Sequence, residues 1–124
     1  QEELRWLEYA QRLRDQRRNR ITLPGQPSVG DLLWQQAAAG GAQACGIQQG
    51  TLAVGQRADW LVLRDEAWLG SIGSHAVLNR WLFAGQRDQI RDVYVAGKAV
   101  VEDGVHPHQT ACAARFAQAM EALR

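Results

Sequence analysis

The sequence predicts a mixed α/β chain in which two helices come first, a region of short strands follows, and a last helix closes the chain. Apolar residues recur at helical spacing near the start, glycines separate short β-branched runs from Gly50 onward, and the tail from Thr110 is rich in alanine. These elements supply only about three strands, and so small a sheet leaves faces uncovered. We therefore expect a truncated or processed chain, and the absence of an initial Met agrees with this.

Length and composition are those of one folded domain or of part of a larger one. The chain has 124 residues, 46% of them hydrophobic, and a formal net charge of +1. Its apolar runs are far shorter than the roughly 20 residues that cross a bilayer, and its acidic start lacks the features of a signal peptide. We expect a cytoplasmic protein without a membrane partner.

Arginines are concentrated in the first twenty residues. The six of them share this stretch with four acidic residues, which leaves a local net charge of +2. They are Arg5, Arg12, Arg14, Arg17, Arg18 and Arg20. A nucleic-acid surface needs a stronger excess of positive charge. The pattern favours a solvated or interface face, and no nucleic-acid partner is expected.

The first predicted helix runs from residue 3 to about residue 19. Apolar residues recur there at three-residue steps, beginning at Leu4, and Glu8 stands four residues before Arg12, a spacing that brings opposite charges together on a helix. Two prolines in the segment 23–27 then end the pattern, because proline lacks the N–H donor and disfavours helix at the preceding residue. This segment is predicted to be a loop.

A second helix is predicted over residues 31–46. Strong helix formers fill this stretch, and either Ser28 or Asp31 is placed to cap its start. Gly40 and Gly41 lie inside the helix, where each glycine costs roughly 1 kcal/mol relative to alanine. We therefore expect another element to pack closely against this pair of glycines.

Beyond Gly50 the helical period is lost and shorter elements are predicted. Residues 59–63 form one strand, and residues 93–101 form two strands joined by a tight turn at Ala96 and Gly97. Between them, residues 75–84 fit a short amphipathic helix. A terminal helix over 110–123 carries its larger apolar side chains on one face. These side chains are Phe116, Met120 and Leu123.

The histidines are the first candidates for metal binding or acid–base chemistry. His106 and His108 form a His-x-His pair, but Pro107 between them forbids an interior strand, and a catalytic zinc needs a third protein ligand. A solvated turn is the favoured interpretation of this pair. His75, at a predicted helix start without a partner carboxylate, is interpreted as structural.

No nucleophile stands out among the serines and cysteines. Ser28, Ser71 and Ser74 lie in capping or glycine-rich contexts, with no base at a recognisable spacing. Cys45 and Cys112 lie in alanine-rich surroundings and are interpreted as small buried thiols rather than as a disulfide.

Two further features carry weaker signals. The glycine-rich segment 70–74 could be compared with a phosphate loop, but it lacks the lysine and spacing of one, so a linker is favoured. Asp59 precedes a run of apolar residues, where a carboxylate must find hydrogen-bond partners. We interpret it as an anchor that accepts backbone N–H groups of the turn at residues 55–57, in preference to a catalytic acid.

Three motifs resemble the amidohydrolase superfamily and occur in the order of that family. The most specific is residues 50–63, GTLAVGQRADWLVL, which match the pattern G-x-L-x-x-G-x-x-A-D followed by apolar residues. Residues 37–46, AAAGGAQACG, are similar to a late helix of the family, with Ala39 where Asn is frequent and Cys45 where Leu is usual. Residues 90–104, IRDVYVAGKAVVEDG, are similar to its closing hairpin.

Within the superfamily, residues 2–14 and 79–85 look most like the formimidoylglutamate deiminases. That resemblance implies the C-terminal portion of a larger α/β protein: the last helices of a (β/α)8 barrel, part of a small β-sandwich and a terminal helix. Residues 1–48 would be the barrel helices, and residues 49–124 the share of the composite sandwich with the terminal helix.

The resemblance also implies an activity for the whole enzyme. A zinc-dependent hydrolase of histidine degradation would cleave the formimino C–N bond of N-formimino-L-glutamate, releasing ammonia and N-formyl-L-glutamate. The family's catalytic and zinc-binding residues would all precede Gln1, so no catalytic, cofactor-binding or metal-binding residue is assigned here, and this chain alone is expected to be inactive. The expected partners are the missing N-terminal barrel half, the small-molecule substrate and further copies of the enzyme in a homo-oligomer.

Two alternatives remain open on the sequence. One is the C-terminal part of another amidohydrolase, of the guanine deaminase or triazine hydrolase type, since these enzymes share the sandwich motifs. The other is a free-standing binding module without catalysis. The sequence upstream of Gln1 would separate them, because a distant His-x-His motif supports an enzyme.

Overall fold

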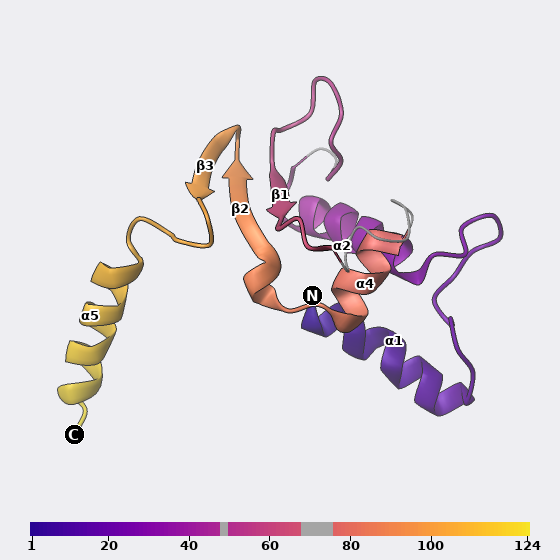
Figure 1. The fold of residues 1–124 in the computed structure, drawn as a ribbon, viewed down its shortest axis with the longest axis horizontal. Coiled ribbons are helices and arrows are strands. Elements are labelled where there is room, and N and C mark those ends of the chain that lie inside the picture. The colour runs from indigo at the N-terminus through magenta and orange to yellow at the C-terminus, as the bar shows by residue number, and fades with distance from the viewer. Residues whose placement is uncertain (48–49, 68–75) are drawn as a thin grey trace.

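The elements follow the predicted order, with helices first, a small antiparallel sheet after them and a helix at the end (Figure 1). The computed structural model describes residues 1–47, 50–67 and 76–124. Its elements are α1 (Glu2–Asp15), α2 (Val29–Ala44), β1 (Trp60–Leu63), α4 (Val77–Ala84), a 3-10 turn (Arg87–Gln89), β2 (Ile90–Val95), β3 (Lys98–Val101) and α5 (Gln109–Glu121). The prediction of a mixed helical and β chain with about three strands is confirmed.

Helix α1 ends four residues earlier than the sequence predicts. Gln16 adopts a left-handed backbone conformation with φ of 51°, which stops the helix after Asp15. The Asp15 carboxylate then accepts hydrogen bonds from the guanidinium groups of Arg14 and Arg20, each at 2.7 Å from Nε. The predicted loop after it is confirmed, since the backbone groups of Leu23 and Gln26 bond to each other.

Helix α2 begins with Ser28, one of the two caps that the sequence allows. The Ser28 hydroxyl accepts a hydrogen bond from the Asp31 backbone N–H at 3.3 Å, which satisfies one of the unpaired donors of the first turn. The expected close contact at Gly40 and Gly41 is wrong. Nothing in the described chain lies within 4 Å of a Cβ built on either residue, because this half of α2 extends past the elements that cover its start.

The close approach occurs instead at Gly30, where α2 crosses α4. A Cβ at Gly30 would lie 2.6 Å from the backbone nitrogen of Asn79 and 2.8 Å from its Cα. The Asn79 side chain also makes two hydrogen bonds to the start of α2. Its Oδ1 accepts from the Gly30 N–H and its Nδ2 donates to the Ser28 hydroxyl, each at 2.8 Å. The contact therefore fixes how the two helices cross.

The hydrophobic core lies at this crossing. Its buried residues are Val29, Leu33, Trp81 and Leu82. The Trp34 ring meets the Trp81 ring edge to face, with centroids 5.1 Å apart. Apolar side chains from α1 and from one face of the sheet pack against the same cluster, so helices and sheet share one core.

The sheet has the order β1-β2-β3 and is antiparallel throughout. The predicted hairpin is confirmed: Ala96 and Gly97 both have positive φ, 51° and 76°, as in a two-residue type I′ turn. Trp60 of β1 lies opposite Tyr94 of β2, and their rings stack with centroids 4.7 Å apart. With three strands, both β1 and β3 are edges.

Side chains from the first residues of the chain donate hydrogen bonds to the carbonyl groups at the C-terminal end of α4. Arg5 donates from Nε to the Leu82 carbonyl at 2.7 Å and from Nη2 to the Gly85 carbonyl at 2.9 Å. The Gln1 side-chain amide donates to the Trp81 carbonyl. A cation at this position also complements the negative end of the helix dipole. Arg5 is therefore a helix-capping residue rather than part of a solvated face.

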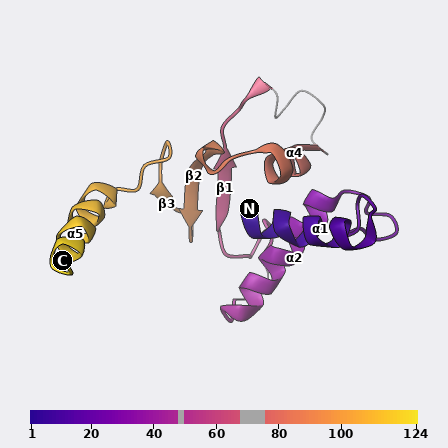
Figure 2. The same ribbon diagram turned by 90° about the horizontal axis from the view of Figure 1, so that it is seen from below.

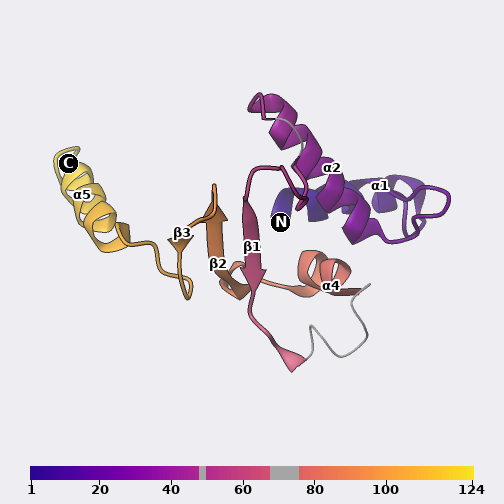
Figure 3. The same ribbon diagram turned by 90° about the horizontal axis from the view of Figure 1, so that it is seen from above.

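Helix α5 stands apart from the other elements, on the β3 side of the sheet (Figures 2 and 3). The prediction of a terminal helix is confirmed, and none of the residues of α5 is buried. Among the described residues, no helix is long and apolar enough to cross a membrane.

Candidate functional site

The histidine pair lies in the segment that joins β3 to α5. The rings of His106 and His108 are exposed, with centroids 5.5 Å apart, and His106 Nδ1 accepts a hydrogen bond from the His108 backbone N–H at 3.1 Å. One ring nitrogen is thus engaged in the turn itself. His75 lies outside the described residues. Across the described ranges, no group of three or more His, Cys, Asp or Glu side chains could hold a metal ion.

The serines and cysteines are only partly placed by the structure. Ser28 is the cap of α2, while Ser71, Ser74 and the segment 70–74 lie outside the described residues. Cys45 and Cys112 are free thiols, so the prediction of no disulfide holds, but the prediction that both are buried is wrong. Both cysteines follow alanine, and alanine-rich stretches of α2 and α5 turn out to be open surface rather than core.

Asp59 is a structural anchor, although its partners differ from the predicted ones. Its Oδ1 accepts the Ala96 backbone N–H at 2.7 Å, which ties the start of β1 to the β2–β3 turn. It also accepts from Arg57 Nε at 3.0 Å. The expected bonds to the backbone of residues 55–57 are not the ones it makes, and its side chain is 42% exposed rather than buried.

We expect Asp59→Ala to lower the free energy of unfolding by about 0.5–1.5 kcal/mol, because it removes one hydrogen bond at a turn that water can still reach. Asp59→Asn retains an acceptor oxygen for the Ala96 N–H and should stay closer to wild type. Urea unfolding of the two variants measures the difference. Equal losses in both would show that the charge pairing with Arg57, rather than the backbone bond, is the stabilising interaction.

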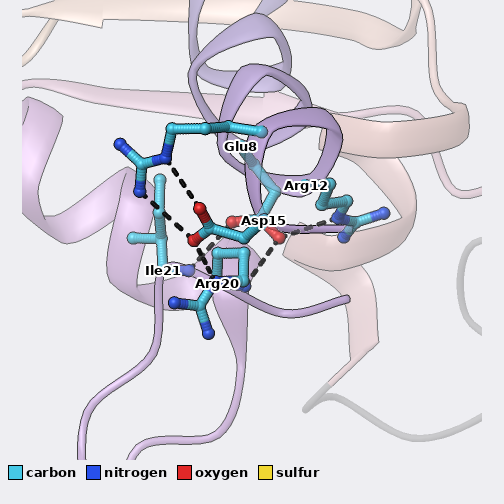
Figure 4. A network of polar contacts seen from close by, with 6 residues as sticks. Glu8, Arg12, Asp15, Arg20 and Ile21 are labelled. Atoms are coloured by element: carbon cyan, nitrogen blue, oxygen red, sulfur yellow. Dashed lines mark hydrogen bonds and ion pairs between the residues drawn. The ribbon is translucent and has the colours of Figure 1, made fainter. Parts of the chain in front are cut away.

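A buried carboxylate that the sequence did not reveal fastens the loop after α1. Glu8 is fully buried, and its oxygens accept from Arg12 Nε at 2.7 Å and from the backbone N–H groups of Arg20 and Ile21 at 3.0 and 2.9 Å (Figure 4). Burial alone would raise the pKa of Glu8, but these three donors outweigh it and hold the pKa below 4.5. In the sequence, only the four-residue spacing between Glu8 and Arg12 pointed to an interaction of this carboxylate.

The arginine cluster is mainly structural. Arg12 pairs with Glu8 and lies over the rings of Tyr9 and Phe83, at 5.4 and 5.0 Å from their centroids. The hydrogen bond from Arg14, followed by that from Arg20, lowers the pKa of Asp15 to about 2. The interpretation as a solvated or interface face fits the exposed Arg17 and Arg18 but not Arg12.

A second polar cluster holds the turn that follows β3. Asp92 is 8% exposed, and its Oδ1 accepts the Asp103 backbone N–H at 3.0 Å. That bond and the hydrogen bond from Arg91 lower the pKa of Asp92. Arg64, which follows β1, donates from Nη1 to the Asp103 carboxylate at 2.7 Å. The cluster therefore links all three strands to this turn.

An apolar groove of about 640 Å³ lies between α2, α4 and the sheet at β1 and β2 in the described part of the chain. It is lined mainly by aromatic and aliphatic side chains. Among them are Trp34, Trp60, Leu61, Leu78, Trp81 and Tyr94. Asp59 is the charged residue in its lining. Its residues suit the burial of apolar groups and offer no acid–base pair.

The chain resembles known proteins over nearly its whole length. No family model matches it. The chain is 54% identical over 123 residues to formimidoylglutamate deiminase from Pseudomonas aeruginosa, a match that covers 98% of this chain and 27% of that protein. The chain therefore spans about a quarter of the length of that relative.

A solved structure gives the same result at the level of the fold. The crystal structure of an amidohydrolase from Brucella melitensis matches 97% of this chain, with a TM-score of 0.83 and 34% sequence identity, and the match covers 26% of that chain. The resemblance predicted from the three motifs is thereby confirmed: this chain is similar in sequence to part of a formimidoylglutamate deiminase, and in fold to part of an amidohydrolase.

Proposed function

We propose that this chain is the C-terminal portion of an enzyme that hydrolyses the formimino C–N bond of N-formimino-L-glutamate, yielding N-formyl-L-glutamate and ammonia. The observation that carries the proposal is the 54% identity to formimidoylglutamate deiminase over 98% of the chain. The match runs over nearly the whole chain rather than over one motif, so it supports a common enzyme.

In that enzyme this chain acts as a scaffold. Residues 1–48 supply the last helices of the barrel, and residues 49–124 supply part of the composite β-sandwich with its terminal helix. The apolar groove between α2 and β1, together with the unpaired edge of β1, suits further strands of the same enzyme. Trp34 and the arginine-rich α1 brace the barrel from this side.

Zinc is the metal that the amidohydrolase resemblance implies, and the residues described here do not fit a site for it. His106 and His108 are exposed and bring no third ligand within the described part of the chain. We therefore assign the metal and every catalytic residue to the rest of the enzyme, and no chemical step is derived for this chain.

The full-length protein is expected to release ammonia from N-formimino-L-glutamate, because a relative that is 54% identical over 98% of this chain is named a formimidoylglutamate deiminase. A coupled ammonia assay of the purified enzyme measures this release. Guanine and an amino-triazine serve as competing substrates. Preferential turnover of either one would replace the proposed substrate, and no turnover of any of the three would reject the deiminase assignment.

A further inference from the structure

Helix α5 carries an apolar face with no partner in the described chain. Phe116, Met120 and Leu123 are 67%, 48% and 80% exposed. Phe116 and Met120, four residues apart, lie on one face of the helix, and Leu123 follows in the turn just past its end. Ala113, three residues before Phe116, extends the same stripe. We call these four residues the α5 stripe.

A helix of this kind needs a partner to be stable. α5 has 13 residues, and isolated helices of about 12–15 residues are marginal in water. No residue of α5 is buried, and the ribbon shows it lying beyond β3, away from the core at the α2–α4 crossing (Figures 1 and 2). Its stability must therefore come from a surface outside the described residues.

Hydrogen bonds hold the turn from which the chain leaves the sheet toward α5. The Gly104 N–H donates to the Arg91 carbonyl at 2.7 Å, and the Asp103 N–H donates to the Asp92 carboxylate at 3.0 Å. Arg64 holds the Asp103 side chain from β1 at 2.7 Å. These bonds hold the turn that follows β3, and beyond it the ribbon leads away from the sheet to α5 (Figure 1).

The likeness to the solved amidohydrolase indicates that a helix like α5 occurs within a longer polypeptide. That match covers 97% of this chain. The few residues left unmatched are fewer than the 13 residues of α5, so the match includes at least part of this helix. In that molecule the matched part is only 26% of the chain. A path like that of α5 thus occurs in a polypeptide of which nearly three quarters lie outside the match.

We propose that the α5 stripe docks against the same polypeptide, on an apolar surface in the part of the enzyme outside these 124 residues. This docking proposal depends on one part of the proposed function, that the chain belongs to a larger amidohydrolase. It does not depend on the identity of the substrate. The stripe itself carries no charge, so the surface that receives it is an apolar groove able to take the Phe116 ring and the Met120 thioether.

Cys112 reports on this docking, because it lies four residues before Phe116 on the same side of α5 and is exposed in the described chain. Iodoacetamide labelling of the full-length protein, read at Cys112 by mass spectrometry, is compared with labelling in urea. We expect at least tenfold slower labelling in the native protein, at a rate that does not depend on protein concentration. Phe116→Ser should raise the native rate at least fivefold, whereas Gln118→Ser on the opposite face should not.

Equal labelling rates of Cys112 in native and unfolded protein would overturn the proposal. Protection that appears only as the protein dimerises would overturn it too, because the occupant would then be a second copy. The ammonia assay on the same samples separates the two hypotheses. A protected Cys112 in protein that does not hydrolyse N-formimino-L-glutamate rejects the substrate and supports the docking, whereas fast labelling of an active enzyme rejects the docking alone.

Discussion

Gly30→Ala is expected to destabilise the 124-residue chain by about 3 kcal/mol, the upper part of the range for inserting a methyl group into a packed contact. The added Cβ would lie 2.6 Å from the Asn79 nitrogen and 2.8 Å from the carbonyl carbon of Leu78. Both are backbone atoms, so no side chain can turn aside and the two helices must separate. Separation would also break the bond from the Gly30 N–H to Asn79 and loosen the core around Trp81.

Gly40→Ala is the matched control, because it makes the same change in the same helix. Nothing in the described chain lies within 4 Å of a Cβ at Gly40, and alanine is the better helix former. It should stabilise the chain by about 0.5–1 kcal/mol. Urea unfolding followed by tryptophan fluorescence compares both variants with wild type. A Gly30→Ala protein as stable as Gly40→Ala would show that the helices do not cross at Gly30.

These two glycines show which parts of the fold local sequence can predict. The Ala96–Gly97 turn was predicted correctly, and Ser28 was one of two caps predicted for α2, because each depends on residues within a few positions of one another. The contact at Gly30 depends on Asn79, 49 positions away, so nothing near Gly30 indicates it. The exposed glycines of α2 were more conspicuous in the sequence because they are adjacent, although they contact nothing here.

The residues of the candidate site likewise include some that the sequence predicted and some that it could not. The motif at residues 50–63 predicted the resemblance to amidohydrolases that the comparisons confirm. Asp59 within it was interpreted as an anchor, and its partner Ala96 comes from a distant turn. The apolar groove is formed by α2 and two strands that meet only in the folded chain, so periodicity could not predict it. The exposure of Cys45 and Cys112 was missed because alanine-rich surroundings resemble a core in composition.

Glu8→Ala is expected to lower the free energy of unfolding by about 2–4 kcal/mol, because it leaves the backbone N–H groups of Arg20 and Ile21 without their acceptor and Arg12 without its partner. Glu8→Gln keeps the shape and one acceptor oxygen, so its loss should be smaller. Glu3→Gln, an exposed change on the same helix, should have little effect. The sequence suggested only a surface pair with Arg12, whereas the loop folding back onto α1 makes the carboxylate buried.

The pH dependence separates the charge of Glu8 from its packing. Because the pKa of Glu8 is lower in the folded protein than its ordinary value of 4.5, ionised Glu8 stabilises the fold above that value, and this stabilisation is lost as the pH falls through the folded pKa. Urea unfolding of wild type between pH 7 and pH 3 should therefore show a steeper loss of stability below pH 4.5 than Glu8→Gln shows. Parallel curves for the two proteins would mean that Glu8 is protonated in the fold or unpaired, and that the loop is held to α1 by packing alone.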